Sequence, residues 1–442
     1  MNGGITRAAA HGATAVLAGL LLSTVSAKAA DLGGNCCADL EERVAELEAT
    51  TARKGNRRVS LTVSGQVTRT ILYWNDGNES GTYAGLDNHN QSTRFVFSGS
   101  AKIRPDLTAG FEFMTEWTGA GRTSQVDQNT PDQVVTTAAI ANGADGVLAV
   151  RTANWWLEDK HWGRVTVGRV NVGGPVGTID LGGISTVAHF SPGLLGGGFQ
   201  IAGTAAEIAA GGGTRLSSVV GPTYGGDRIE GVRYDTANIG GFVGQATWGE
   251  DDVCSASLRY AGEFGGVRVA AGIGYQAQDP SATQTIQLDT GARFLDNEWS
   301  GSLALMHTAS GLFAQGHYAR SEFLNGTDAR FWMIQGGITK NWFGLGNTSL
   351  FAEYGEASDY IKSGLVFGTG VQAAQATAAG ASSEVEFFGL GVVQQIDAAA
   401  MELYLGWRRF ETDVSDIGAP AVGLRNGSGD LDLVHGGARI RF

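Results

Sequence analysis

The chain of 442 residues carries a formal net charge of −13 at pH 7, and its mean hydropathy of −0.05 is close to neutral. Glycine accounts for 68 residues, roughly twice the ordinary share, but no Gly-X-Y period is present, which excludes a collagen-like chain. After the N-terminus, no apolar run reaches the roughly 20 residues of a membrane-spanning helix. The acidic charge argues against a nucleic-acid partner. The chain is therefore either a soluble protein or a membrane β-barrel, whose inward residues dilute its hydrophobicity.

Residues 1–29 predict a signal peptide. Arg7 supplies a positive charge, residues 13–22 form a short apolar core, and Ala-Lys-Ala at 27–29 matches a cleavage site. A helical membrane anchor is the alternative, but the apolar core is too short for it. Cleavage after residue 29 would remove two of the 31 basic residues and none of the 44 acids, which leaves 29 − 44 = −15. This balance favours a cation-tolerant interior or acidic outer loops.

Residues 30–58 predict a periplasmic segment that contains a short coiled-coil helix. Four residues repeat at spacings of 4, 3 and 4, as in a coiled-coil seam: Leu40, Val44, Leu47 and Thr51. Two heptads are marginally stable alone, but they would be stabilised if three chains lay side by side. A single solvated helix is the alternative.

From residue 59 to the end, the hydrophobic pattern has a period of two. Residues 401–408, for example, read Met-Glu-Leu-Tyr-Leu-Gly-Trp-Arg, so that one face is apolar and the other polar. About sixteen such segments lie between Val59 and Phe442. At 330–340 and 384–396, it is ambiguous which of the alternating residues form the apolar face. The pattern predicts an all-β domain over residues 59–442.

The connections between these segments alternate in length, and aromatic residues gather at the segment ends. Short connections such as 104–106 and 397–399 alternate with long ones such as 118–150 and 357–383. Short periplasmic turns, long outer loops and aromatic girdles are typical of bacterial outer-membrane barrels. We therefore predict a transmembrane antiparallel β-barrel of about sixteen strands, whose apolar face meets lipid and whose polar face meets water.

Three stretches of sequence resemble the alphaproteobacterial outer-membrane porin family: DLEERVAELEATTARKGN at 39–56, VSLTVSGQV at 59–67 and ILYWNDG at 71–77. The resemblance covers the whole mature chain. It implies sixteen strands, a homotrimer, an outer-membrane location and passive diffusion of small hydrophilic solutes and ions. Phe442, with Ile440 two residues before it, resembles the C-terminal signal that the barrel-assembly machinery reads. Outer-membrane lipid and lipopolysaccharide are the other expected partners.

In porins generally, the third long loop folds into the barrel and narrows it. The strand count places this loop at about 171–226. A constriction opposes loop carboxylates to wall arginines, which gives Asp180 and Glu207 on the loop and Arg94, Arg164 and Arg439 on the wall as candidates. The alternative is that these residues merely solvate the lumen or bind lipopolysaccharide.

Three other functions are alternatives to a general diffusion channel. A barrel-embedded hydrolase would need a nucleophile and a base, but the chain has neither a G-x-S-x-G motif nor a helical H-x-x-x-H pair. No catalytic residue, metal site or cofactor is therefore predicted. A substrate-specific channel, for example for sugars, would need an aromatic slide, for which Trp156 and Phe351 are candidates. A secreted β-adhesin would lack membrane strands and the terminal Phe signal.

Overall fold

The computed structural model describes residues 59–118, 121–129, 147–172, 176–177, 179–210, 212–220, 228–277, 286–288, 291–293, 295–323, 326–363, 380–417 and 424–442. The predicted signal peptide and the predicted helix within 30–58 lie outside these residues.

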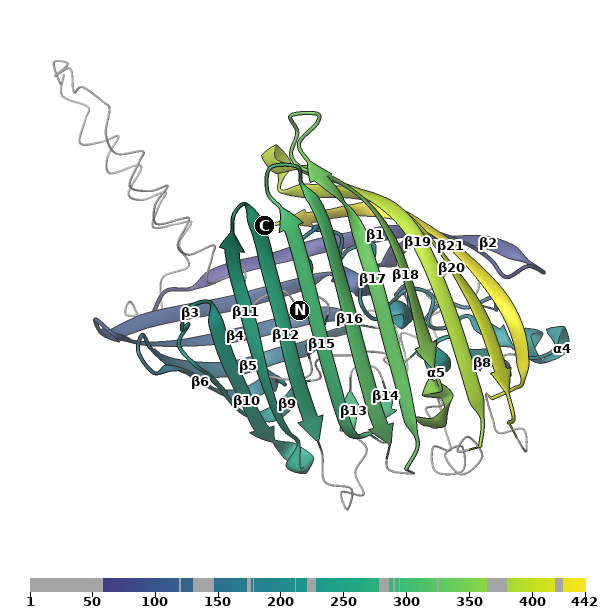
Figure 1. Ribbon diagram of the computed structural model, residues 1–442, viewed down its shortest axis with the longest axis horizontal. Coiled ribbons are helices and arrows are strands. Elements are labelled where there is room, and N and C mark those ends of the chain that lie inside the picture. The colour runs from purple at the N-terminus through teal and green to yellow at the C-terminus, as the bar shows by residue number, and fades with distance from the viewer. Residues whose placement is uncertain are drawn as a thin grey trace.

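Within the described residues, sixteen long antiparallel strands form a closed barrel wall (Figure 1). The wall strands are, in chain order, β1 (Thr62–Asn75), β3 (Arg94–Arg104), β4 (Leu107–Thr118), β5 (Val147–Asp159), β6 (Gly163–Asn171), β9 (Arg228–Asp235), β10 (Phe242–Gly249), β11 (Cys254–Phe264), β12 (Val267–Ala277), β15 (Leu295–His307), β16 (Leu312–Phe323), β17 (Asp328–Lys340), β18 (Thr348–Ser358), β19 (Ser382–Ile396), β20 (Met401–Ser415) and β21 (Gly427–Arg441). This confirms the predicted fold class and strand number.

Shorter elements lie in the connections. They are β2 (Ser80–Asp87), η1 (His89–Gln91), η2 (Pro192–Leu194), β7 (Gln200–Ala202), α4 (Ala205–Ala209), β8 (Thr214–Arg215), α5 (Ser217–Val220), η3 (Glu250–Asp252), β13 (Ile286–Leu288), β14 (Gly291–Arg293), η4 (Tyr360–Ser363) and η5 (Asp397–Ala399). None of the helices in the described part of the chain is long and apolar enough to cross a membrane. Tight turns join the strands at one end of the barrel, which we call the turn end, and the opposite end is the long-loop end.

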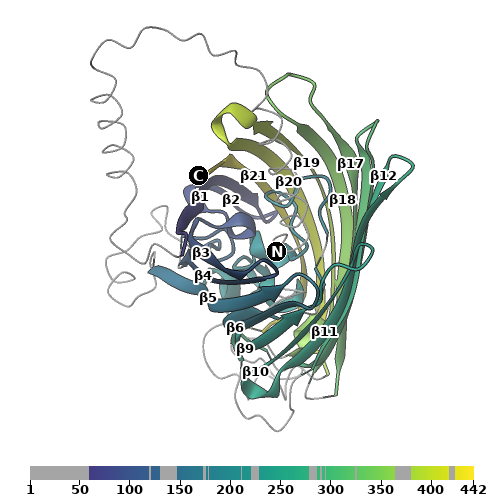
Figure 2. The ribbon, with the colours of Figure 1, turned by 90° about the vertical axis from the view of Figure 1, so that its left-hand side faces the viewer.

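The barrel closes where the first and last strands pair. β1 and β21 run antiparallel from the pair Gln66 and Arg441 to the pair Asn75 and Asp432 (Figure 2). On its other side, β1 pairs with two strands in succession, with β3 near the turn end and with β2 near the long-loop end. The 3-10 helix η1 joins these two strands, and it is thereby positioned to turn into the lumen.

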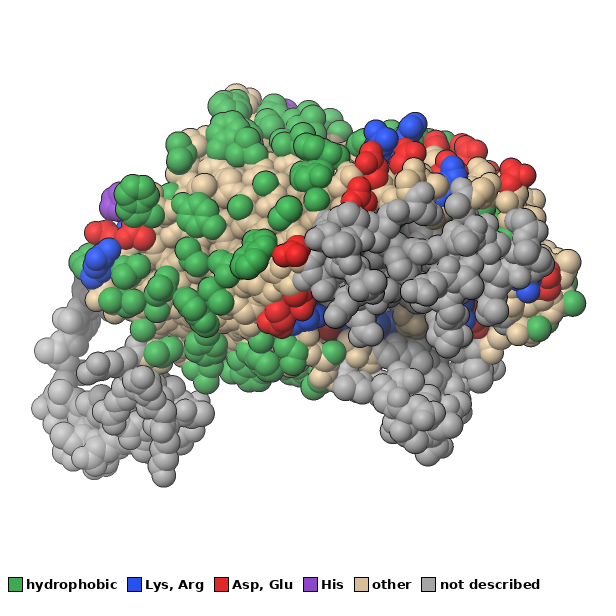
Figure 3. Space-filling view, turned by 90° about the horizontal axis from the view of Figure 1, so that it is seen from below, with side chains coloured by type: hydrophobic (Ala, Val, Ile, Leu, Met, Phe, Trp, Pro, Cys, Tyr) green, Lys and Arg blue, Asp and Glu red, His purple; other side chains and the backbone are tan. Residues whose placement is uncertain are grey.

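Side chains alternate between the two faces of the wall as predicted. On β20, Leu403 and Leu405 point outward and are 42% and 53% exposed, whereas Glu402 points inward and is fully buried. Hydrophobic side chains are spread over the face that Figure 3 shows, and many Asp and Glu side chains gather toward one end of it. At the long-loop end of β18 and β19, the outward carboxylates of Glu356, Glu384 and Glu386 lie within 4.8 Å of one another. Much of the acidic charge of the described chain therefore lies outside the lumen.

The lumen is not polar throughout, contrary to the expectation that the inward face meets only water. Phe331 on β17, Phe387 on β19 and Phe410 on β20 point inward and are fully buried. They belong to one hydrophobic cluster with loop residues such as Phe199 and Leu216. β17 and β19 contain the two segments, 330–340 and 384–396, in which the alternation of apolar and polar residues is ambiguous. It is ambiguous because the inward faces of these strands pack on loop residues and are therefore apolar, like their outward faces.

Replacement of Phe387 by Ala is expected to lower the free energy of unfolding by about 3–5 kcal/mol, because it leaves a cavity between the wall and the loop. Leu390→Ala, on the outward face of the same strand where Leu390 is 55% exposed, provides the control. Its cost should be clearly smaller. Urea unfolding of the refolded barrel in lipid vesicles measures both values, and equal losses would argue against a packed interior at β19.

Candidate functional site

The long connection between β6 and β9 follows the inner face of the wall in its described residues, 176–177, 179–210 and 212–220. We call it loop 3. Small wall residues make room for it. A Cβ atom at Gly272 on β12 would lie 2.7 Å from the Val176 side chain, and one at Gly406 on β20 would lie 2.3 Å from that of Val187. Glycine is required at both wall positions, because any larger side chain would occupy the space that the loop fills.

Wall side chains complete the backbone hydrogen bonds that the loop cannot make with itself. The pairs are Val176 N to Ser300 Oγ at 2.5 Å, Ile179 N to Ser302 Oγ at 2.9 Å, Leu181 N to Gln315 Oε1 at 3.1 Å, Thr339 Oγ1 to Gly182 O at 3.0 Å and Ser349 Oγ to Gly182 O at 2.7 Å. Buried backbone groups need such partners. Inward Ser, Thr and Gln residues on the wall therefore fix the path of the loop.

The carboxylate of Asp180 stabilises a turn of loop 3 beside the wall. Its Oδ1 accepts a hydrogen bond from Gly183 N, and its Oδ2 accepts one from Ser185 N, both at 2.8 Å. Gly183 has a φ of +71°, which favours glycine. Burial raises the pKa of Asp180 above its ordinary value, although the two amide donors oppose this shift. Asp180 thus stabilises its own loop as well as contributing a negative charge.

The helix η1 and its flanking residues contact loop 3 from the opposite side. Asn88 Nδ2 donates to Thr186 O at 3.1 Å, and Gln91 Nε2 donates to Ser185 Oγ at 3.4 Å. Gln66 of β1 donates to the carbonyl of Gln91 at 3.1 Å. The connection between β1 and β3, which contains η1, therefore bridges the wall and loop 3. Together, η1 and loop 3 bound one section of the lumen.

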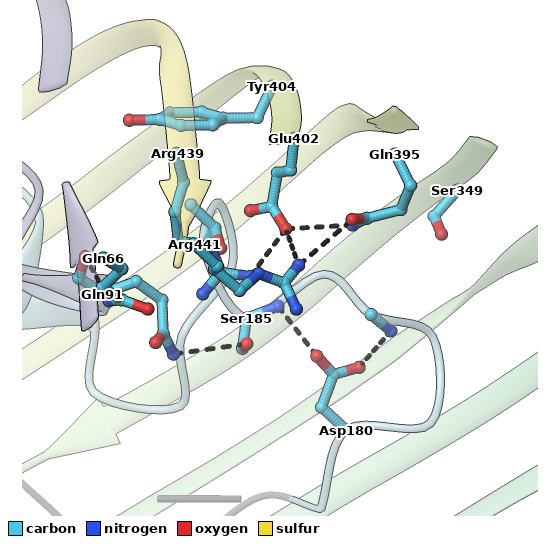
Figure 4. Close-up of polar contacts among 12 residues, drawn as sticks. Gln66, Gln91, Asp180, Ser185, Ser349, Gln395, Glu402, Tyr404, Arg439 and Arg441 are labelled. Carbon is cyan, nitrogen blue, oxygen red and sulfur yellow. Dashed lines mark hydrogen bonds and ion pairs between the residues drawn. The ribbon is translucent and has the colours of Figure 1, made fainter. Parts of the chain in front are cut away.

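Two arginines of β21 face this section and share one carboxylate. Arg439 Nη2 lies 2.6 Å and Arg441 Nη2 lies 3.2 Å from the same oxygen, Oε2 of Glu402. Gln395 Nε2 donates to that oxygen at 2.9 Å. Figure 4 shows this cluster above loop 3, with the Asp180 carboxylate turned toward its own backbone.

Arg94 lies in the same part of the wall. The ladders pair Arg441 with Gln66, Gln66 with Arg94, and Arg94 with Glu116, so these four residues form one row across β21, β1, β3 and β4. Arg94 Nη2 donates to Gln91 Oε1 at 2.6 Å. Arg94 therefore links the row to η1.

Glu116, at the end of this row, is buried and surrounded by guanidinium groups. Its Oε1 lies 3.4 Å from Arg122 Nη2, and its Oε2 is paired with Arg151 and accepts a hydrogen bond from Ser92 Oγ at 2.7 Å. Arg151 lies on β5, and Arg122 lies in the connection between β4 and β5. Glu116 therefore links the row to the next strand and to this connection.

Two of the predicted constriction residues lie apart from this row. Glu207 caps the short helix α4, accepting a hydrogen bond from Thr204 N at 2.9 Å, and pairs with Arg425 at 2.6 Å. The hydrogen bond from the Thr204 backbone lowers the pKa of Glu207. Arg164 lies one residue after the turn that follows β5, with its Nε 2.9 Å from Glu158 Oε2 and its guanidinium over the Trp156 ring.

The structure thus brings Asp180, Arg94 and Arg439 to one section of the lumen and leaves Glu207 and Arg164 outside it. The sequence interpretation missed Arg441, although it shares the inward parity of Arg439. It also missed Gln91, because this residue lies in η1, outside the segments whose hydrophobic pattern alternates. Phe351, a candidate for an aromatic slide, is buried in a cluster with Ile184 of loop 3.

Comparison with known proteins relates the chain to outer-membrane channels. The profile of a family described as Gram-negative porin matches residues 13–427. None of the curated protein sequences matches. Among solved structures, an anion-selective porin from Comamonas acidovorans has a TM-score of 0.50 at 14% identity, covering 87% of this chain and 100% of that one. OmpF of Salmonella typhi in complex with daunomycin has a TM-score of 0.48 at 16% identity, covering 86% and 97%. At such identities, the first likeness supports the barrel fold alone.

Replacement of Gly406 by Ala is expected to push loop 3 off the wall, because the new methyl group would overlap the Val187 side chain. Overpacking of this kind costs about 1–3 kcal/mol. Gly301→Ala is the control, since its Cβ would meet its nearest neighbour at an ordinary 3.5 Å. Urea unfolding and limited proteolysis of the folded barrel give the two readouts. Equal behaviour of the two variants would show that Gly406 does not support the loop.

Proposed function

Because this chain belongs to the Gram-negative porin family, and forms a channel for passive diffusion of small hydrophilic solutes across the outer membrane, we propose that its narrowest section lies between loop 3, η1 and β21. The observation that supports this proposal is the contact of Gln91 with Ser185, which joins the inward first connection to loop 3. The residues that bound the section are Asp180, Ser185, Gln91, Arg94, Arg439 and Arg441.

The proposed constriction has a loop side and a wall side of different chemistry. The loop side offers Asp180 and Ser185, and the wall side offers arginines, which stay charged at any relevant pH. Charged side chains in a narrow section set the preference among ions and orient polar solutes. In this proposal, Glu207 lies on the surface of loop 3 and Arg164 lies at the turn end of the lumen. Both meet solutes outside the narrowest section.

We also infer that the chain acts as a channel and catalyses no reaction. Two of the described histidines contact a hydroxyl group: His307, whose Nδ1 lies 2.7 Å from Ser310 Oγ in an exposed turn, and His89, whose Nδ1 lies 2.6 Å from Ser124 Oγ. Its other ring nitrogen, however, lies 3.1 Å from Arg122 Nη1. In a Ser-His-Asp triad, a carboxylate occupies that position and stabilises the protonated ring. Burial and the Arg122 charge instead lower the pKa of His89 well below its ordinary value, so this histidine is a poor base.

The proposed partners are two further copies of the chain, outer-membrane lipid, lipopolysaccharide and the barrel-assembly machinery. The coiled-coil pattern in 30–58 supports a homotrimer. The charged outward residues at the long-loop end of β16 to β21, such as Arg320 and Asp328, which pair at 3.3 Å, offer contacts for charged headgroups. Phe442, at the turn end of β21, carries the proposed assembly signal.

Purified protein in a planar lipid bilayer should produce stepwise conductance, because a water-filled barrel passes ions without gating chemistry. Steps in groups of three would support the trimer. Complete absence of conductance from folded protein would contradict the channel function.

Replacement of Ser185 by Trp should lower the single-channel conductance at least about twofold, because a large ring would fill the proposed narrowest section. Ser100→Trp is the matched control. Ser100 also points inward, but it lies six residues further along β3 than Arg94, about 20 Å nearer the turn end. Recordings of both variants in potassium chloride test the placement, and an equal loss in both would place the constriction elsewhere.

A further inference from the structure

We propose that this channel prefers small anions over cations, although the whole chain is acidic. The inference deepens the proposed function, since it names the class of solute that the narrowest section favours. It depends on how the charges of the lumen are distributed among the strands, and not on their total number in the sequence.

The first observation is a surplus of guanidinium groups on one stretch of the inner wall. Arg439 and Arg441 share the single carboxylate of Glu402. Arg122 and Arg151 share the single carboxylate of Glu116. Each group of three therefore carries one net positive charge.

Arg94 lies between these two groups and adds a third positive charge. Its hydrogen-bond acceptor is the neutral amide oxygen of Gln91. Among the described residues, no carboxylate lies within ion-pair distance of it, even though Glu116 is its neighbour on β4. The same stretch contains Asp87, which pairs with Arg69 at 3.9 Å. Among the described residues it thus combines six arginines with three carboxylates, which leaves a surplus of three positive charges.

The second observation is that the surplus is concentrated in space. Arg441, Gln66 and Arg94 occupy one row on adjacent strands, so the backbones of Arg441 and Arg94 are about 10 Å apart. This is comparable to the Debye length of about 8–10 Å near physiological salt. The fields of the two arginines therefore overlap, and an ion that passes between loop 3 and β21 meets both.

The third observation concerns the facing side, where loop 3 offers little to offset this charge. Both oxygens of Asp180 accept hydrogen bonds from amides of the same loop. Glu207, the other carboxylate predicted for the constriction, is paired with Arg425 away from the row. The described part of loop 3 therefore presents one carboxylate to a wall with three surplus positive charges.

Two other charge pairs line the lumen. Arg164 pairs with Glu158, and Arg233 pairs with Asp235 at 2.6 Å. These pairs contribute little net field to a passing ion. Arg259 on β11 adds one guanidinium beside the second pair, whereas the stretch around Arg94 has a surplus of three. This stretch therefore contributes most to the discrimination between the signs of charge.

Guanidinium groups also indicate which anions would fit. Their planar donors match the paired oxygens of a carboxylate or a phosphate group. Arg441 is exposed, and Arg94 is partly exposed, so their donors can be reached from the lumen. Small organic acids and inorganic phosphate are thus the solute class that this section favours over cations of similar size.

The test is the reversal potential of the channel under a potassium chloride gradient. The wild-type channel should favour chloride over potassium at least about threefold. The double variant Arg94→Gln, Arg441→Gln should bring this ratio close to one. Arg164→Gln is the matched control, because it also removes one guanidinium but from a paired site about 27 Å along the strands from the row, and it should leave the ratio unchanged. Retained single-channel steps show that each variant is folded.

The possible results separate the two levels of the proposal. A wild-type channel that conducts but prefers potassium overturns the anion preference and leaves the diffusion channel intact. A double variant with an unchanged ratio, or a control that shifts the ratio as far as the double variant does, overturns the assignment to the row around Arg94. Folded protein without any conductance overturns the proposed channel itself.

Discussion

The constraint on which the rest of this structure depends is that no water is available to backbone amides inside a membrane. Every strand must pair on both sides, and the first strand must therefore meet the last. The pairing of β1 with β21 meets this requirement. It also brings residues from the two ends of the barrel domain together on one inner surface. The row that includes Gln66 and Arg441 exists because the barrel is closed.

The same constraint reappears inside the barrel, where loop 3 cannot form regular hydrogen bonds with the strands. Side chains on the wall take the place of a neighbouring strand. Ser302 and Gln315 accept hydrogen bonds from the loop backbone, while Phe387 and its neighbours bury the apolar side of the loop. The interior is consequently divided. One part is packed like the core of a soluble protein, and the other, bounded by loop 3 and the arginines, remains available to solutes.

Charge is divided in a similar way. Many acidic side chains project outward at the long-loop end, as do those of Glu384 and Glu386. The arginines near Arg94 project inward, where they outnumber the carboxylates. A net charge calculated from the composition averages over these two environments. The field that a permeating ion meets depends only on the inner one, because salt screens charges that lie more than about 10 Å away.

The sequence alone determined which residues face lipid, since a period of two can satisfy only one arrangement of a half-buried strand. It also predicted the number of strands, and it proposed Asp180 and Arg439 as residues of one constriction. The tertiary structure decided which charges meet. Arg441 and Arg94 become neighbours only through the register of β1 with β21 and with β3, and hydrogen bonds between strands so distant in the chain leave no local pattern. The inward faces of β17 and β19 were ambiguous for a related reason: their apolar residues pack on a loop whose path depends on the finished barrel.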